Sequence, residues 1–223
     1  MCGRYTHEYT WRELHAMYSG TKLVTPDADP EPAYNVAPTQ LQWVVVPADD
    51  GSDLAVEMRW GLLPPWAKDN KLAYSTINAR LETIAEKPSF RGAWKAGRRC
   101  LVLASGYYEW PEKEQTKQRK QPYYIHLPDS KVLVFGGIWE RKGELETYSI
   151  VTKEPDPVIA DMHDRMPLIL PTTMWGDWLR GSSEDAMGIA MTAPEPPLTF
   201  HKVDPAVGNV RNQGRQLIEP IAA

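Results

Sequence analysis

The apolar segments of this chain are short, and their length limits the possible folds more than any other feature. The longest of them, residues 41–47 and 131–139, have the length of β-strands. Neither approaches the ~20 residues that a membrane-spanning helix needs. Between residues 53 and 60 the apolar side chains alternate, so that they share one face of a strand: Leu54, Val56, Met58 and Trp60. The sequence therefore predicts a fold dominated by β-sheet, without a membrane-spanning segment.

Turn and helix signals divide the chain into short elements. Thr10 and Glu13 have the spacing of a capping box, which predicts a helix over 11–19, and the segment 21–40, rich in proline and acidic residues, reads as a loop. We expect a hairpin of strands 41–47 and 53–60, further strands at 99–104, 107–110, 122–127, 132–139, 146–152, 167–170 and 198–203, and helical pieces at 82–96, 156–162, 172–179 and 183–190. This order predicts an α+β fold. A single domain, residues 1–223, is expected, whose antiparallel sheet curls into a barrel-like core with flanking short helices.

The chain has two cysteines, Cys2 and Cys100, which is too few for a disulfide scaffold and is typical of a reducing compartment. Cys100 lies in the apolar run RCLVLAS and is expected in the core. The first residues, MCGRYTHEYTW, lack the apolar stretch of a signal peptide. We therefore expect an intracellular, cytoplasmic protein.

The charge distribution allows a local contact with nucleic acid but not a generally basic surface. The net charge of −4 argues against a protein that binds nucleic acid over its whole surface, because phosphates are neutralised by lysine and arginine. Residues 59–101, however, carry nine basic and three acidic side chains. A basic segment within an acidic protein is what a localised DNA track needs.

Cys2 has two nucleophiles once Met1 is removed, and an aminopeptidase removes Met1 when the second side chain is small. An α-amine has a pKa of about 7.7–8.0, against about 10.4 for lysine, so far more of it is neutral and nucleophilic near pH 7. The amine condenses with an aldehyde to an imine, and the thiol then closes a five-membered thiazolidine ring. This chemistry makes aldehydes the natural target of a processed Cys2.

Seven segments of the chain together are similar to one known family. In chain order they are MCGRY, YNVAP, RWGLLPPWAKD, INARLET, CLVLASGYYEW, IVTKEPDPVIADMHDRMPLIL and HKVDPAVGNVRNQG. They resemble the SOS-response-associated peptidase (SRAP) family and span almost the whole sequence. The resemblance implies the SRAP fold and an enzyme that senses and shields abasic sites in single-stranded DNA. In that family the processed cysteine crosslinks to the ring-opened deoxyribose of the lesion.

The same resemblance implies four catalytic residues. Cys2 matches the nucleophile, and the matching segments contribute Asn78, Glu109 and His163. Glu109 is suited to moving protons if burial raises its pKa, and His163 to protonating the departing sugar oxygen or binding the neighbouring phosphate. Asn78 offers a donor and an acceptor for the α-amine or a sugar oxygen. Autocatalytic removal of Met1 and reversal of the crosslink through Glu109 are further hypotheses.

Further side chains are expected to contact the DNA strand. Three arginines lie within two residues of these groups, and their planar guanidinium groups suit phosphate oxygens. Trp66 stands between two prolines and a polar loop, a poor place for a core residue, and with Pro38 it would cover a base. The expected contacts are Arg4, Arg80 and Arg165 from charge, Trp66 and Pro38 from position, and Asn35, Trp110 and Thr152 from the resemblance.

Two other readings remain open. Class II glutaminase domains also begin Met-Cys-Gly, which makes an N-terminal-nucleophile amidohydrolase a rival. Those domains resemble one another in an Asn-Gly pair that helps to form the oxyanion site, and no asparagine of this chain is followed by glycine. A non-catalytic reader of damaged DNA is the other. We expect a monomer without metal or cofactor. Its expected partners are single-stranded DNA with abasic sites, at the nucleoid, and replication-fork proteins.

Overall fold

A five-stranded barrel forms the core of the computed structural model, which describes residues 2–18, 21–68, 75–111, 121–130 and 132–221. Four neighbouring pairs around it are antiparallel, and a parallel pair between β11 and β5 closes the ring. In the order of pairing its strands are β5 (Asp53–Trp60), β4 (Leu41–Pro47), β7 (Arg99–Ala104), β10 (Leu133–Lys142) and β11 (Leu145–Lys153). The predicted barrel-like core and α+β class are confirmed, and the parallel closure is an addition to the prediction.

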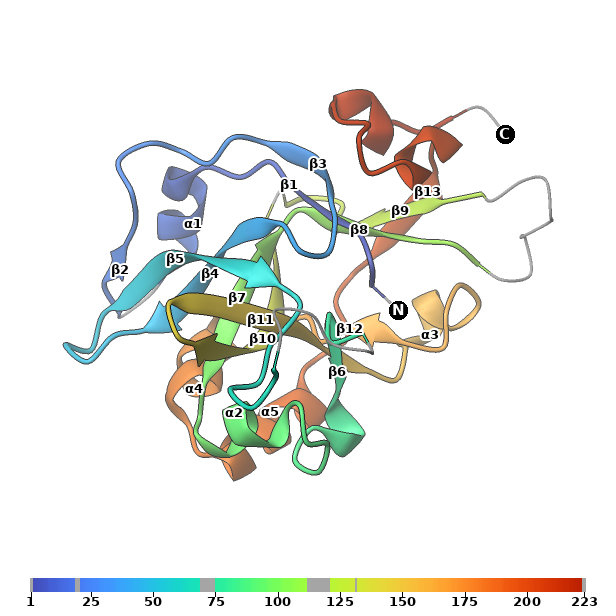
Figure 1. The fold of residues 1–223 in the computed structure, drawn as a ribbon. Coiled ribbons are helices and arrows are strands. Elements are labelled where there is room, and N and C mark those ends of the chain that lie inside the picture. The colour runs from blue at the N-terminus through green and yellow to red at the C-terminus, as the bar shows by residue number, and fades with distance from the viewer. Residues whose placement is uncertain (1, 19–20, 69–74, 112–120, 131, 222–223) are drawn as a thin grey trace.

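Strand β7 is buried on both faces. In β7, Cys100, Val102 and Ala104 pack into one apolar cluster, while Leu101 and Leu103 pack into another. The second cluster is covered by helices α2 (Arg91–Lys95), α4 (Trp175–Arg180) and α5 (Ser183–Thr192), which Figure 1 shows on the side of the barrel away from β1 and β8. Cys100 is therefore a core residue, as expected.

A second, five-stranded sheet lies against the barrel and carries the start of the chain. Its strand order is β13 (Thr199–Lys202), β9 (Tyr123–His126), β8 (Gly106–Glu109), β1 (Tyr5–His7) and β3 (Ala33–Val36). The chain passes directly from β7 into β8 through Ser105. Gly106 is required there, because a Cβ atom at this position would lie 2.4 Å from the Tyr124 ring. The second sheet therefore brings β1 and β8 side by side (Figure 1).

Short strands attached to β11 and β5 complete the barrel sheet. β6 (Asn78–Arg80) runs parallel to β11, and β12 (Met166–Pro167) pairs with β11 in the antiparallel sense. β2 (Leu23–Val24) adds to β5. The prediction of a loop over 21–40 was wrong at β2 and β3, because pairing with β5 and β1 supplies backbone partners that local composition does not indicate.

Most helices are shorter than expected, and α5, expected at 183–190, extends to Thr192. Helix α1 (Trp11–Met17) begins at the predicted capping box, in which Thr10 accepts from the Glu13 backbone N–H. Segment 82–96 holds a 3₁₀ turn and α2 rather than longer helix, and the strand expected at 167–170 is reduced to β12 and a single bridge at Ile169. Helix α3 (Pro157–Ala160) is one turn long. No helix among the described residues is long and apolar enough to cross a membrane.

Candidate active site

Cys2 lies where the two sheets meet. The backbone N–H of Tyr108 donates to the carbonyl of Arg4, which holds the segment before β1 against β8. Figure 1 shows this segment running from β1 toward β6 and β12. The side-chain Nδ2 of Asn78, the first residue of β6, donates to the carbonyl oxygen of Cys2 at 2.9 Å. Cys2 is fully buried at this junction.

Glu109 ends β8 beside Cys2 and has an unusual acidity. Its side chain is buried, and this burial raises its pKa from 4.5 to about 7. The thiol of Cys2 is also buried, and its pKa is raised first by burial and then by the negative charge of Glu109. The carboxyl group therefore exchanges a proton near neutral pH and stands next to a thiol that holds its own proton tightly. Burial of Glu109, the condition for its expected role, is met.

His163 lies in the segment between α3 and β12, where its Nδ1 atom has two partners. The backbone N–H of Arg165 donates to Nδ1 at 3.0 Å, which requires a lone pair there. An Asp164 carboxylate oxygen lies 2.8 Å from the same atom, which requires a proton. We assign the first contact to the neutral ring, with its proton on Nε2, and the second to the protonated ring. His163 thus has a partner in each protonation state.

Asn78 connects Cys2 to open space. Its Oδ1 atom is buried and has no hydrogen-bond partner among the described residues. Asn78 also lines a cavity of about 400 Å³, together with Ser75, Arg80, Thr83, Lys87, Pro88, Ser89 and Phe90. Arg80 and Lys87 are exposed. A ligand that enters this cavity meets two cations and an amide that is already fixed to the carbonyl of Cys2.

Two of the three predicted arginines have hydrogen-bond partners within the protein, and Arg4 is only partly buried. Arg165 is buried, donates to both carboxylate oxygens of Glu82 at 2.8 Å, and also donates to the carbonyl of Thr152. Arg4 donates to Asn35 at 2.7 Å and to the carbonyl of Val207 at 2.9 Å. Burial lowers the pKa of Arg4. Of the three, Arg80 alone is exposed.

The expected DNA contacts of Asn35 and Thr152 meet an obstacle, since neither side chain has exposed surface. The amide of Asn35 donates to three carbonyl groups of the C-terminal segment, those of Val207, Asn209 and Asn212. Asn35 thus holds Arg4 and that segment, and Thr152 contributes its carbonyl to Arg165. The expected DNA contacts of both residues stay a prediction.

The aromatic and proline contacts lie nearer the surface. Trp66, in the connection between β5 and β6, is 55% exposed, as its position between prolines predicted. Pro38 and Trp110 are partly exposed. Thr39, next to Pro38, has a φ of 77°, a left-handed conformation that β-branched residues rarely adopt. Glu82 was not among the predicted site residues, because its partner Arg165 is 83 positions away in the sequence and no local pattern links the two.

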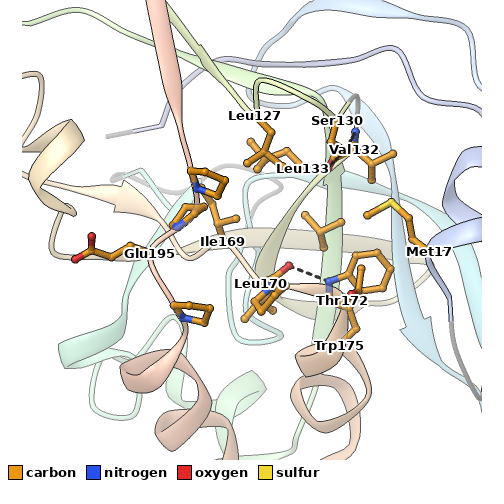
Figure 2. A pocket seen from close by; sticks show the side chains of 15 residues that line it. Met17, Leu127, Ser130, Val132, Leu133, Ile169, Leu170, Thr172, Trp175 and Glu195 are labelled. Atoms are coloured by element: carbon orange, nitrogen blue, oxygen red, sulfur yellow. Dashed lines mark hydrogen bonds between the residues drawn. The ribbon is translucent and has the colours of Figure 1, made fainter.

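An apolar cavity elsewhere in the fold shares no lining residue with the cavity beside Asn78. It has a volume of about 280 Å³ and is shown in Figure 2, where Trp175 donates to the carbonyl of Leu170 at 3.0 Å. None of the predicted site residues lines it. Within the part of the chain that the structure describes, no three His, Cys, Asp or Glu side chains are grouped to hold a metal ion.

Comparison with known proteins identifies the family of this chain. The profile of the family described as SOS response associated peptidase (SRAP) matches residues 1–210, which include every residue of the site. The chain belongs to the SRAP family. This SRAP protein shares 34% identity with the abasic site processing protein YoqW of Bacillus subtilis, over 98% of this chain and 99% of that protein. It shares 35% with YedK of Escherichia coli, also named an abasic site processing protein, over 99% and 100%.

A mammalian relative and solved structures extend the comparison. The abasic site processing protein HMCES of Rattus norvegicus is 35% identical over 85% of the SRAP chain and 65% of its own length. A crystal structure from Bordetella bronchiseptica superposes with a TM-score of 0.77, covering 91% of this chain and all of the other at 24% identity, which shows a shared fold. A phage-related protein from the same organism superposes with a TM-score of 0.71 at 26% identity, over 91% and 94% of the two chains.

Proposed function

We propose that this protein processes abasic sites in single-stranded DNA by forming a covalent crosslink through Cys2 after Met1 has been removed. The observation that carries the proposal is the meeting at Cys2 of a buried carboxyl group with a pKa of about 7 and an amide that donates to the Cys2 carbonyl. The names of the curated relatives, which align with nearly the whole chain, support abasic DNA as the substrate.

The reaction uses both nucleophiles of the processed residue. The α-amine of Cys2 attacks the C1′ aldehyde of the ring-opened sugar, and loss of one water gives an imine. Sγ then bonds to the same carbon, and the proton of the thiol ends on the nitrogen. The product is a five-membered thiazolidine, formed with release of one water and no change in oxidation state.

Glu109 serves as the proton carrier for both steps. In its protonated form it donates to the hydroxyl group that leaves the carbinolamine as water, and as a carboxylate it accepts the proton of the Cys2 thiol. A pKa of about 7 makes both forms available near neutral pH. The thiol needs such a base because burial raises its own pKa.

Asn78 and His163 position the reacting groups. The hydrogen bond from Asn78 to the Cys2 carbonyl fixes the residue whose amine and thiol react, and Oδ1 of Asn78 offers an acceptor to the amine or to a sugar hydroxyl. Protonated His163 donates to the sugar oxygen that leaves when the ring opens. Its contact with Asp164 stabilises the protonated ring.

The strand is bound by a small number of exposed groups. Arg80 and Lys87, at the cavity beside Asn78, neutralise phosphates, and exposed Trp66 stacks on a base. Arg4 and Arg165 act chiefly as the frame of the site because their guanidinium groups are bonded within the protein. An abasic nucleotide suits this site because no base has to be extruded from a stack.

The crosslink would shield the lesion in the strand from cleavage and error-prone synthesis. Proton transfer through Glu109 also runs in reverse, so slow release of intact protein is part of the proposal, as is autocatalytic cleavage of the Met1–Cys2 bond by the same groups. We place the protein at the nucleoid when it is bound to DNA, where replication-fork proteins are candidate partners.

The test mixes the protein with a single-stranded oligonucleotide that carries one abasic site and separates the products on a denaturing gel. We expect a shifted band for the native protein and for Cys100→Ala, which removes only the core thiol, and none for Cys2→Ala. A band shift in a native gel alone would favour a non-covalent reader of damaged DNA. Release of ammonia from glutamine, without a crosslink, would favour the amidohydrolase and contradict the proposal.

A further inference from the structure

Tyr107 lies among the reacting groups but has no role in the steps above. It stands directly opposite Tyr5 in the pairing of β8 with β1, and two positions before Glu109 on β8. Because side chains alternate along a strand, Tyr107 and Glu109 point to the same face. Tyr107 is fully buried and belongs to the same apolar cluster as Cys2 and Met162, the neighbour of His163.

The hydroxyl group of Tyr107 lacks a hydrogen-bond partner among the described residues. The hydroxyl groups of two neighbouring tyrosines, one opposite on β1 and one next along β8, do have partners. The hydroxyl of Tyr5 is hydrogen bonded to that of Tyr148 at 2.7 Å, and Tyr108 donates to the carbonyl of Tyr34 at 2.7 Å. A buried hydroxyl without a partner costs free energy of folding, and phenylalanine would fill the same space without this cost. The oxygen of Tyr107 is therefore available to a partner that the described residues do not supply.

We propose that the Tyr107 hydroxyl donates a hydrogen bond to the sulfur of Cys2 while the thiazolidine ring closes. This inference rests on the proposed function. In the step, the thiol proton passes to the Glu109 carboxylate, Sγ bonds to the imine carbon, and the imine nitrogen receives a proton from Glu109. Tyr107 keeps its own proton throughout and stabilises the negative charge on sulfur before the new bond forms.

The acidity of Tyr107 fits a donor that is not consumed. Burial raises the pKa of the phenol well above its ordinary value, and the negative charges of Cys2 and then Glu109 and Asp156 raise it further. The effect of Cys2 on this pKa is the largest of the three, which agrees with a hydroxyl close to the sulfur. A hydroxyl that stays protonated at every working pH stabilises the thiolate without becoming a competing base.

The test compares Tyr107→Phe with Tyr108→Phe, a matched control from the next position on β8 whose side chain points to the opposite face. Trapping with borohydride measures how fast the imine forms. The crosslink that survives denaturation without borohydride measures how fast the ring closes. For Tyr107→Phe we expect imine formation within about twofold of the native rate. Ring closure should be about tenfold or more slower, since losing a hydrogen bond to a charged group slows a reaction by about this factor. Its closure rate should also rise at a higher pH than that of the native protein.

Stability separates this role from a structural one. Tyr107→Phe should unfold at the same or a higher temperature than the native protein, whereas Tyr108→Phe, which loses a made hydrogen bond, should unfold at a lower one. Site-specific 3-fluorotyrosine at position 107, a stronger donor that retains the ring, should speed closure.

The outcomes distinguish the two proposals. Native closure rates and an unshifted pH profile in Tyr107→Phe, with the native protein crosslinking normally, would overturn the role of Tyr107 alone. Slow closure accompanied by a fall in unfolding temperature as large as that of Tyr108→Phe would assign Tyr107 a packing role instead. Absence of any crosslink with the native protein would overturn the proposed function itself.

Discussion

Replacing Glu109 with glutamine should make the protein more stable and less active, with the gain in stability largest at neutral and alkaline pH. Because the pKa of Glu109 is higher in the folded protein than its ordinary 4.5, the folded state binds more protons between pH 4.5 and about 7, and stability falls as the pH rises through this window. A rise to about 7 corresponds to roughly 3 kcal/mol of destabilisation above pH 7. Glutamine, neutral at every pH, avoids it.

Thermal unfolding of both proteins at pH 5 and pH 8 measures this effect. For a chain of this size, roughly 3 kcal/mol corresponds to an increase of about 6–12 °C in the unfolding temperature of Glu109→Gln at pH 8. At pH 5, about half a unit above the ordinary pKa of 4.5, only about a quarter of this difference should remain, roughly 1 kcal/mol or about 2–4 °C. The rate of crosslink formation should fall by about 10²–10⁴-fold, the usual contribution of a general acid or base. An equal shift at both pH values would show that the carboxyl group of Glu109 does not titrate in this range.

Three further predictions concern other parts of the site. The stability of Glu82→Gln should depend on pH in the opposite sense to that of Glu109→Gln, because the hydrogen bonds from Arg165 lower the pKa of Glu82. In thermal unfolding, Glu82→Gln should be less stable than the native protein at pH 7 and equally stable at low pH. Asn78→Asp keeps the shape but loses the donor to the Cys2 carbonyl, so single-turnover crosslinking should slow by about tenfold or more without loss of fold by circular dichroism. Trp66→Ala should weaken non-covalent binding of single-stranded DNA by about 1–3 kcal/mol in fluorescence titrations while leaving the unfolding temperature unchanged, because this side chain is 55% exposed.

The fold was predictable where the signal is local. The limits of β4 and β5 agree with the hairpin expected at 41–47 and 53–60, because alternation over eight residues has one simple reading. Helix α1 begins where its capping box indicates. The parallel pairing of β5 with β11 joins segments about 90 residues apart, and strand β3 exists because β1 pairs with it. Such long-range pairing leaves no local pattern in the sequence.

The site, too, was predictable only where the sequence signal is local. The exposure of Trp66 was predictable from the prolines beside it, whereas the chemistry of a processed Cys2 stays a prediction. The sequence analysis assigned Arg165 to DNA phosphates because of its charge, whereas in the structure both of its amino groups contact Glu82. The burial of Asn35 likewise depends on the C-terminal segment folding over it. Residue type predicts what a side chain is able to bind, and only the fold determines which partner occupies it.

The most direct test of the account is mass spectrometry of the crosslinked N-terminal peptide, residues 2–4, after proteolysis of the complex with abasic DNA and treatment with a thiol-alkylating reagent. We predict a peptide without Met1, joined to the nucleotide with loss of one water, whose Cys2 sulfur is not alkylated because it is part of the thiazolidine ring. A linked peptide that retains Met1, or one whose Cys2 is alkylated, would contradict the account.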